Sequence, residues 1–374
     1  MIYLDSAATT LQKPPSVRRA VFSAMERMAS PGRGGHRPAM LAAETVFQCR
    51  QAAAELFGMT DPENVIFTLN ATHALNLAVK SVVKPGDTVV ISGYEHNAVT
   101  RPLKALGCHV KVARAPLFEW ERMLAAFEEM VTGEVSCVIC THVSNVFGYI
   151  LPVEEIARLC RERKVPLILD ASQSAGTLPV RMDELGCAFI GMPGHKGLYG
   201  PQGTGLLLCG EGRETSTLLE GGTGSLSAKQ EMPDFLPDRL EAGTHNVPGI
   251  AGLLEGIRFV KRRGESAILR RERELTRQAA RGLSAIPGVT VYAAENWAAQ
   301  AGVLSFQLEN LDCEEVGERL GQRGIALRAG LHCAPCAHES AGTAERGTVR
   351  ASFSDFNTPA EVRTLIREVS RLAG

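Results

Sequence analysis

Residues 187–205 read CAFIGMPGHKGLYGPQGTG. The first residues are apolar or small and predict a buried strand, and the remainder forms a turn rich in glycine and proline in which Lys196 follows His195. A surface lysine needs no such setting. A lysine that attacks a carbonyl group must first lose its proton, and a dry site at the end of a strand favours that loss. The stretch therefore predicts an α/β sheet that carries a reactive amine.

The chain on the amino-terminal side of this stretch alternates between short apolar runs and helical patterns. Seven runs predict strands, at residues 65–68, 88–92, 109–113, 135–141, 165–170, 187–192 and 204–209. Apolar residues at helical spacing between these runs predict helices within residues 68–83, 97–106, 119–131 and 152–164. Strands that alternate with helices indicate a seven-stranded, mainly parallel sheet with helices on both faces.

The alternation of predicted strands and helices ends after the last of these strands. Residues 211–247 form a long irregular segment, which inside a compact protein is usually functional. Two helices are then predicted, at about residues 249–263 and 265–285, followed by strands and helices in another order. We expect a large domain of residues 12–255 and a smaller α+β domain of residues 256–374 together with residues 1–11.

Composition narrows the range of functions. The 374 residues carry a net charge of −1, so nucleic acid is not an expected partner. No apolar run is long enough to span a bilayer and no leader pattern opens the sequence, so we expect a soluble, cytoplasmic protein. Most of the ten cysteines lie in apolar runs and are expected to pack as free thiols. Cys333 and Cys336, in GLHCAPCAH, lie instead among glycine, proline and histidine.

Three polar residues follow predicted strands. Asp170 ends one strand, Lys196 follows another and Asn145 follows a third, and ligands of open α/β sheets bind beyond the carboxyl ends of strands. Residues 70–72 lie where a strand gives way to a helix, whose free N–H groups suit a phosphate. An amine, an aspartate for a ring nitrogen and a phosphate cradle together indicate a pyridoxal phosphate site. Taken singly, Lys196 would be interpreted as a loop lysine and Asp170 as a helix cap, and only their combination favours the cofactor site.

Ten motifs along the whole chain carry a resemblance to a known family. They are YLDSAATT, GRGGH, NATHALNLA, YEHNA, THVSNVFG, DASQSAG, GHKGLYGPQGTG, EAGTHN, RAGLHCA and TVRASFSDFNT. In their order they resemble the class V aminotransferase family of fold-type I pyridoxal phosphate enzymes. Within it the sequence is similar to the cysteine desulfurases and selenocysteine lyases, and above all to the SUF-type, group II desulfurases.

The resemblance implies a role for each site residue. The implied catalytic residues are Lys196, which bonds to the cofactor, His96, which stacks on its ring, and Cys333. Further cofactor contacts are implied for Ala71, Thr72, Asn145, Asp170, Gln173, His195 and Thr244. Thr244 is implied to reach the cofactor of a second subunit, so a homodimer with shared active sites is expected. Substrate contacts are implied for Asn145, Arg350, Arg328 and Arg33, and no metal site is expected.

Cys333 decides the reaction that the resemblance implies. It matches the nucleophile that takes sulfur from the substrate cysteine, leaving alanine and a persulfide that an acceptor protein collects. Selenocysteine fits the same residues, so a selenocysteine lyase stays an alternative. We also hypothesise that Cys336 either resolves the Cys333 persulfide by forming a disulfide or only packs beneath the loop.

Two departures from the SUF-type pattern concern the turn that holds Lys196. Pro193 stands where many relatives have a serine that binds phosphate, and Gly197 is an additional residue before LYGP.

Three rival functions also stay open. They are a class V aminotransferase or β-lyase that does not mobilise sulfur, a zinc or redox module built on His332, Cys333, Cys336 and His338, and a cofactor-binding scaffold without activity.

Overall fold

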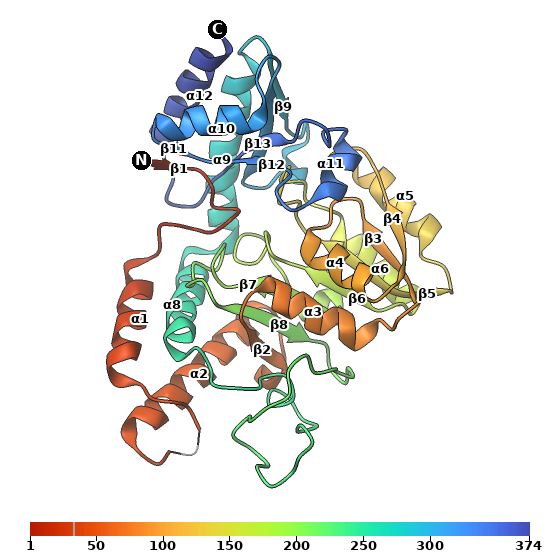
Figure 1. Ribbon diagram of the computed structural model, residues 1–374, viewed down its shortest axis with the longest axis vertical. Coiled ribbons are helices and arrows are strands. Elements are labelled where there is room, and N and C mark those ends of the chain that lie inside the picture. The colour runs from red at the N-terminus through yellow and green to blue at the C-terminus, as the bar shows by residue number, and fades with distance from the viewer. Residues whose placement is uncertain (33) are drawn as a thin grey trace.

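The computed structural model describes residues 1–32 and 34–374. Its centre is a seven-stranded sheet (Figure 1). In spatial order the strands are β2 (Val65–Thr68), β8 (Gly205–Cys209), β7 (Phe189–Pro193), β6 (Leu167–Asp170), β5 (Val135–Thr141), β3 (Thr88–Ser92) and β4 (His109–Ala113). Neighbouring strands are parallel except that β8 runs antiparallel to both β2 and β7. The predicted fold class, fold-type I with a mainly parallel sheet, is confirmed.

The predicted strands all form, with small changes at their ends. The runs predicted to begin at residues 165, 187 and 204 begin at Leu167, Phe189 and Gly205. The four central strands β5 to β8 are buried almost throughout, which is why they read as continuous apolar runs.

Alternate residues of each strand point to opposite sides of the sheet, and apolar residues lie on both sides. Helices therefore cover both faces. On one face Ile66, Ile139 and Leu207 pack with α3 (Ala71–Val82) and α4 (Asn97–Ala105). On the other face Val65, Val138 and Leu206 pack with a set of helices from several parts of the chain. These helices are α2 (Arg37–Leu56), α5 (Trp120–Met130), α6 (Val153–Glu162), α7 (Met182–Leu185) and α8 (Val247–Arg263).

Two amino-terminal helices are additions that the sequence analysis did not assign. α1 (Pro15–Arg27) and α2 both pack against α8, and the three helices lie together at one side of the sheet (Figure 1). A short 3₁₀ turn, η1 (Pro62–Asn64), leads from α2 into β2. Residues 211–246, predicted to be irregular, contain no helix or strand and form the long loop at the foot of Figure 1.

A second, four-stranded antiparallel sheet forms the carboxyl-terminal part of the chain. Its order is β12 (Arg328–Gly330), β13 (Thr348–Ser352), β10 (Val303–Leu308) and β9 (Val289–Tyr292). The accompanying helical elements are α9 (Glu265–Ser284), η2 (Trp297–Ala299), α10 (Cys313–Gln322), α11 (Pro335–Ala341) and α12 (Pro359–Ala373). α12 begins with a capping box between Thr358 and Glu361.

The amino terminus lies beside this second sheet. β1 (Ile2–Tyr3) pairs in parallel with β11 (Ile325–Ala326), and the N-terminus is close to β11 in Figure 1. Leu4 packs in the same apolar cluster as α9 and α12. The domain boundaries at residues 11 and 255 stay a prediction. Among the described residues, no helix combines the length and apolar character that crossing a membrane requires.

Candidate active site

A pocket of about 220 Å³ opens at the carboxyl ends of the parallel strands. The ends of β5, β6 and β7, the first turn of α3, residues 7–8 and the segment from Arg328 to Arg350 all contribute to its wall. Ten of the thirteen predicted site residues line it: Ala71, Thr72, His96, Asn145, Asp170, Gln173, His195, Lys196, Arg328 and Arg350. The sheet therefore brings together side chains that are up to 279 positions apart in the sequence.

Lys196 lies three residues beyond the end of β7 and faces this pocket. Its side chain is partly exposed to the pocket, yet surrounding protein atoms desolvate the ammonium and lower its pKa to about 8. Asp170 opposes this effect, while the positive charges of Arg350 and Arg328 add to it. The free amine that the sequence analysis anticipated is therefore accessible near neutral pH.

Asp170 is the last residue of β6, on the strand next to β7, and is only 2% exposed. One carboxylate oxygen accepts a hydrogen bond from the backbone N–H of Ser172 at 2.9 Å. The other oxygen has no hydrogen-bond partner in the described part of the chain. A carboxylate in this position suits a cationic ring nitrogen in the pocket.

The first turn of α3 presents backbone donors to the same pocket. Asn70 caps the helix by accepting a hydrogen bond from the N–H of His73, but the N–H groups of Ala71 and Thr72 have no partner within residues 1–32 and 34–374. Gly205 of β8 allows this arrangement, because a Cβ there would lie 2.8 Å from the carbonyl carbon of Asn70. Free donors at a helix N-terminus attract an anion such as a phosphate.

Three further side chains are held in fixed orientations at the pocket wall. Nδ1 of His96 accepts a hydrogen bond from the N–H of Ala98, which caps α4. Nε2 of Gln173 donates to the carbonyl of Ala7. Nδ1 of His195 lies 3.0 Å from Oγ1 of Thr9, and burial lowers the pKa of His195 to about 4, so its ring is neutral.

Arg350 is 1% exposed and is oriented by two partners. It donates to the carbonyl of Asn145 at 2.9 Å and to Oδ1 of Asp5 at 2.7 Å. The Asn145 side chain is itself engaged, because its amide donates to the carbonyl of His332. Nε of Arg350 is buried without a partner in the described structure. Asp5 lies in the YLDSAATT motif, yet the sequence analysis gave it no role.

Cys333 lies beside the pocket and does not line it. Its side chain is exposed, and Sγ is 3.8 Å from a guanidinium nitrogen of Arg328. His332 and Cys333 both adopt the left-handed backbone conformation, with φ of 52° and 56°. Each such non-glycine residue costs about 1–2 kcal/mol. The Cys333 carbonyl accepts a hydrogen bond from the N–H of Asn97, which fixes the loop to the start of α4. Strain of this kind is common at functional sites.

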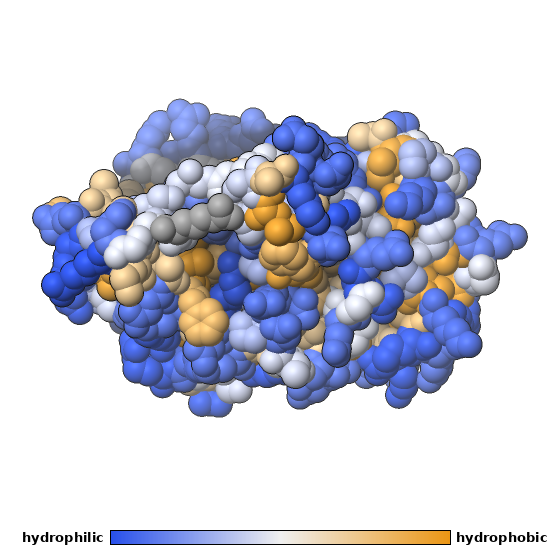
Figure 2. Space-filling view, turned by 90° about the horizontal axis from the view of Figure 1, so that it is seen from below, coloured by the Kyte–Doolittle hydropathy of each residue, from blue (hydrophilic) through white to orange (hydrophobic). Residues whose placement is uncertain are grey.

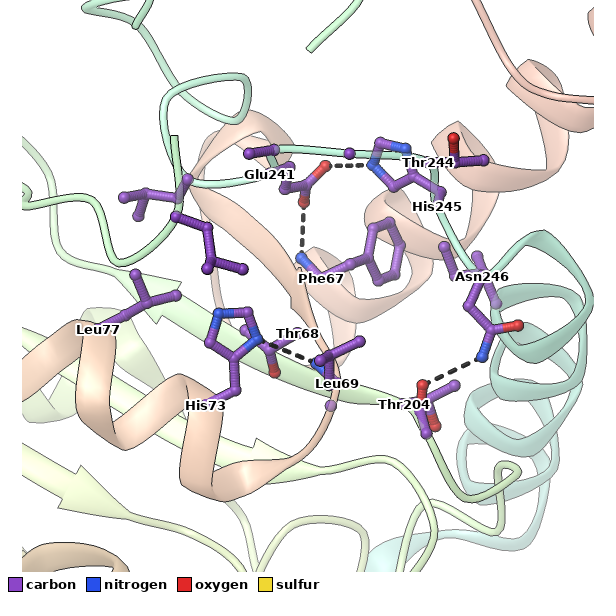
Figure 3. Close-up of a pocket in the computed structure, with 17 residues that line it drawn as sticks. Phe67, Thr68, Leu69, His73, Leu77, Thr204, Glu241, Thr244, His245 and Asn246 are labelled. Atoms are coloured by element: carbon purple, nitrogen blue, oxygen red, sulfur yellow. Dashed lines mark hydrogen bonds and ion pairs between the residues drawn. The ribbon is translucent and has the colours of Figure 1, made fainter. Parts of the chain in front are cut away.

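Thr244 does not line the Lys196 pocket. It lines a neighbouring, largely apolar pocket between β2, α3 and the 211–246 loop, together with His73 (Figure 3) and Leu219. Glu241 organises the wall of this pocket. It accepts hydrogen bonds from the N–H of Phe67 and from two guanidinium nitrogens of Arg50, and it contacts His245. Figure 3 shows its contacts with Phe67 and His245. Burial acts to raise the pKa of Glu241, but the bonds from His245 and Arg50 outweigh it and lower the pKa.

The two pockets do not test the predicted role of Arg33 or the alternative of a zinc site. Arg33 falls outside the described residues. The zinc alternative receives no support, because no three His, Cys, Asp or Glu side chains within residues 1–32 and 34–374 form a metal-holding group. His338, one of its proposed ligands, is buried and bonded to Thr343. Cys336 lies in the first turn of α11.

The residues of the pocket fit pyridoxal phosphate. A desolvated lysine amine, a buried carboxylate on the adjacent strand and unpartnered N–H groups at a helix start are the three features that this cofactor needs. Pro193 lines the pocket without offering a hydroxyl, so a phosphate bound there would depend more on Ala71, Thr72 and His195.

Comparison with known proteins agrees with this site. The family model described as "Aminotransferase class-V" matches residues 2–365. A protein of Mycolicibacterium paratuberculosis named probable cysteine desulfurase is 34% identical over the whole chain, which spans 55% of that relative's length. A protein of the same name from Methanothermobacter thermautotrophicus is 32% identical, and the chain covers 95% of it.

Solved structures show the same similarity. The apo structure of a cysteine desulfurase from Thermococcus onnurineus matches with a TM-score of 0.91 and 31% sequence identity. That match covers 100% of this chain and 94% of the other. The resemblance stated from the motifs is confirmed.

Proposed function

Because the chain belongs to the class V aminotransferase family, whose members depend on pyridoxal phosphate, we propose that it is a cysteine desulfurase. The reaction converts L-cysteine and the Cys333 thiol into L-alanine and a Cys333 persulfide. One sulfur atom moves: the carbon–sulfur bond of the substrate is reduced while the Cys333 sulfur is oxidised, so no other reactant is needed. The observation that carries the proposal is the exposed Cys333 thiol beside the Lys196 pocket.

Each residue of the pocket has a task in this proposal. Asp170 would hold the ring nitrogen of the cofactor, Gln173 its phenolic oxygen and the start of α3 its phosphate, and His96 would contact its ring. The bound cofactor supplies an electron sink that makes a substrate α-proton acidic. Nζ of Lys196 takes and returns protons, for which a pKa of about 8 is well suited.

Substrate binding is assigned to the arginines. The guanidinium group of Arg350 is fixed by Asn145 and Asp5 and keeps further N–H groups free for a substrate carboxylate. Arg328 lines the pocket and also contacts the Cys333 sulfur, so it links the substrate site to the thiol. The exposure of Cys333 also suits transfer of the persulfide to an acceptor protein.

The direct test is product analysis with purified holoenzyme and cysteine. A desulfurase releases alanine and, with a reductant, sulfide in equal amounts. An aminotransferase forms pyridoxamine phosphate and an oxo acid instead, and that result would refute the proposal. The same assay with selenocysteine measures the alternative lyase activity, which the arginines and Lys196 support equally well.

Arg350→Ala is expected to lower kcat/KM for cysteine by roughly a hundredfold or more. Losing one partner of a buried, hydrogen-bonded charge pair costs about 2–5 kcal/mol. The visible spectrum of the bound cofactor should stay unchanged. Arg346→Ala, at an exposed arginine on the same segment, is the control and should behave as wild type. Loss of the cofactor spectrum with normal substrate affinity would contradict the assignment.

A homodimer with shared active sites is the expected assembly. Large apolar side chains are exposed on α1, α2 and the 211–246 loop, and the face at the foot of Figure 1 shows apolar areas among polar ones (Figure 2). The most exposed of these side chains are Phe22, Met25, Met40, Phe47 and Leu219. Exposed apolar side chains gathered on one face are typical of protein interfaces. Thr244 lies on this loop, away from its own subunit's Lys196 pocket.

Thr244→Ala is therefore expected to weaken cofactor retention by roughly tenfold, the worth of a hydrogen bond to a charged group. Thr217→Ala, on the same loop but bonded to Glu220, is the matched control. Dialysis followed by absorbance measures the retained cofactor, and sedimentation measures the assembly. A monomer that keeps full activity would overturn both the dimer and this role.

A cytoplasmic location is also proposed. All ten cysteines lie in the described part of the chain and are free, as is usual for a reducing compartment.

A further inference from the structure

A second, smaller pocket adjoins Lys196. Its space open to the centres of water molecules is about 30 Å³, enough for about two waters. It shares Ala7, Gln173 and Lys196 with the cofactor pocket. The rest of its wall mixes apolar residues with five polar ones, which are Ser6, Thr10, Thr177, Ser352 and Glu272. Lys196 thus lines two pockets, and the proposed mechanism uses only one.

Glu272 is the one acidic side chain in the wall of this small pocket. It lies on α9, which runs from the large sheet toward the second sheet (Figure 1), and it is 7% exposed. Its carboxyl has no hydrogen-bond or ion-pair partner within residues 1–32 and 34–374. A Cβ on Gly302 would lie 2.7 Å from Oε2 of Glu272, so the carboxyl rests against the bare backbone of another pocket residue.

A buried carboxyl group without a hydrogen-bond or ion-pair partner is unusual. Glu265, on the same helix and equally buried, is paired with Arg181 at 2.7 Å. A buried carboxyl without a protein partner is normally bonded to water. Burial raises the pKa of Glu272 well above its ordinary value, and the nearby carboxylate of Asp355 adds to the effect. The carboxyl therefore holds a proton more strongly than an exposed glutamate does.

We propose that Glu272 exchanges protons with Lys196 through water molecules in the small pocket, and so controls when the lysine nitrogen carries a charge. In one direction an N–H bond of the Lys196 ammonium breaks and a water receives the proton. A second water passes a proton to a carboxylate oxygen of Glu272, where an O–H bond forms. The reverse steps restore the first state. One proton moves, no electrons are transferred, and the net charge of the pair is unchanged.

Few other charged or titratable groups lie near Glu272, and each can be considered in turn as its partner in proton exchange. Asp355 is paired with Arg263 of α8, at 2.9 and 3.0 Å. The phenol of Tyr199 also faces Glu272, but burial raises its pKa far beyond the neutral range. Lys196 is the remaining group, and its pKa of about 8 lies where an exchange partner is useful.

The test is a pH titration of the full-length holoenzyme by absorbance. The visible band of the bound cofactor reports whether the Lys196 nitrogen is protonated. A carboxylate stabilises the protonated nitrogen, so in Glu272→Gln the midpoint is expected about one pH unit lower than in wild type, equal to tenfold more unprotonated nitrogen at a given pH. Glu265→Gln is the matched control on the same helix and should leave the midpoint unchanged.

Superimposable titrations of wild type and Glu272→Gln would overturn the inference. Glu272→Asp keeps an acid in the pocket, and its midpoint should lie between the other two; it also serves if Glu272→Gln does not fold. Trace acetylation of Lys196 in full-length protein stripped of cofactor is an independent measurement, in which the same order of midpoints is expected. The inference rests on the proposed bond between Lys196 and the cofactor. Its failure is distinguishable, because protein that binds no cofactor shows no visible band at all.

Discussion

Lys196→Ala protein is expected to form no covalent bond to pyridoxal phosphate. Its rate of alanine formation should fall by roughly a thousandfold or more, as happens when other catalytic nucleophiles are removed. Lys196 lines the cofactor pocket, and desolvation frees its amine near neutral pH. Borohydride reduction of the wild-type holoenzyme followed by peptide mapping should place the pyridoxyl group on this residue alone.

The matched control is Lys13. Burial also lowers its pKa to about 8, and its ammonium donates to the carbonyl of His195, but it does not line the cofactor pocket. Lys13→Gln should therefore keep the reducible bond at Lys196. A pyridoxyl label on Lys13, or equal labelling of Lys196→Ala and wild type, would show that the pocket was assigned to the wrong amine.

Cys333→Ser is expected to abolish sulfur transfer from cysteine, by roughly a thousandfold or more, because a serine hydroxyl cannot hold a persulfide. The visible cofactor spectrum should persist, since Cys333 lies outside the pocket lining. Intact-mass analysis after incubation with cysteine should show one added sulfur on wild type and none on the variant. Persulfide on another cysteine of the variant would refute the role of Cys333.

Cys336→Ser is the natural companion experiment. Burial raises the pKa of the Cys336 thiol, with Glu339 adding to the effect, so little thiolate forms there at neutral pH. This favours packing over persulfide resolution, and the lifetime of the Cys333 persulfide should be the same in Cys336→Ser and wild type. A longer lifetime in the variant would instead support the hypothesis that Cys336 resolves the persulfide.

Six strands of the large sheet were predictable because each is a short, largely apolar run bounded by turn residues. β4, with the sequence HVKVA, lies at the edge of the sheet, is mostly exposed and alternates valine with polar residues. α1 and α2 were not assigned. α1 buries only Val17 and Ala24 along a polar helix, so its apolar period is weak, and its packing depends on α8, more than 200 residues later.

Within the candidate site, the sequence alone identified Lys196, Asp170 and the start of α3, because a parallel sheet brings its strand ends to one edge. The motif resemblance added Cys333 and Arg350. These positions follow from local pattern and from known motifs, and the structure brings the pocket residues together as expected.

Only the tertiary structure decided which groups those residues contact. Asp5 pairs with Arg350 across 345 positions of sequence, and Glu272 reaches the pocket beside Lys196 from a helix whose pattern looks ordinary. The spacing of apolar residues around Asp5 or Glu272 does not reveal these positions. An ion pair or an unpartnered buried acid depends on which distant segments the fold brings into contact. Burial likewise sets the pKa of Lys196, and burial is a property of the packed molecule and not of the letters around a residue.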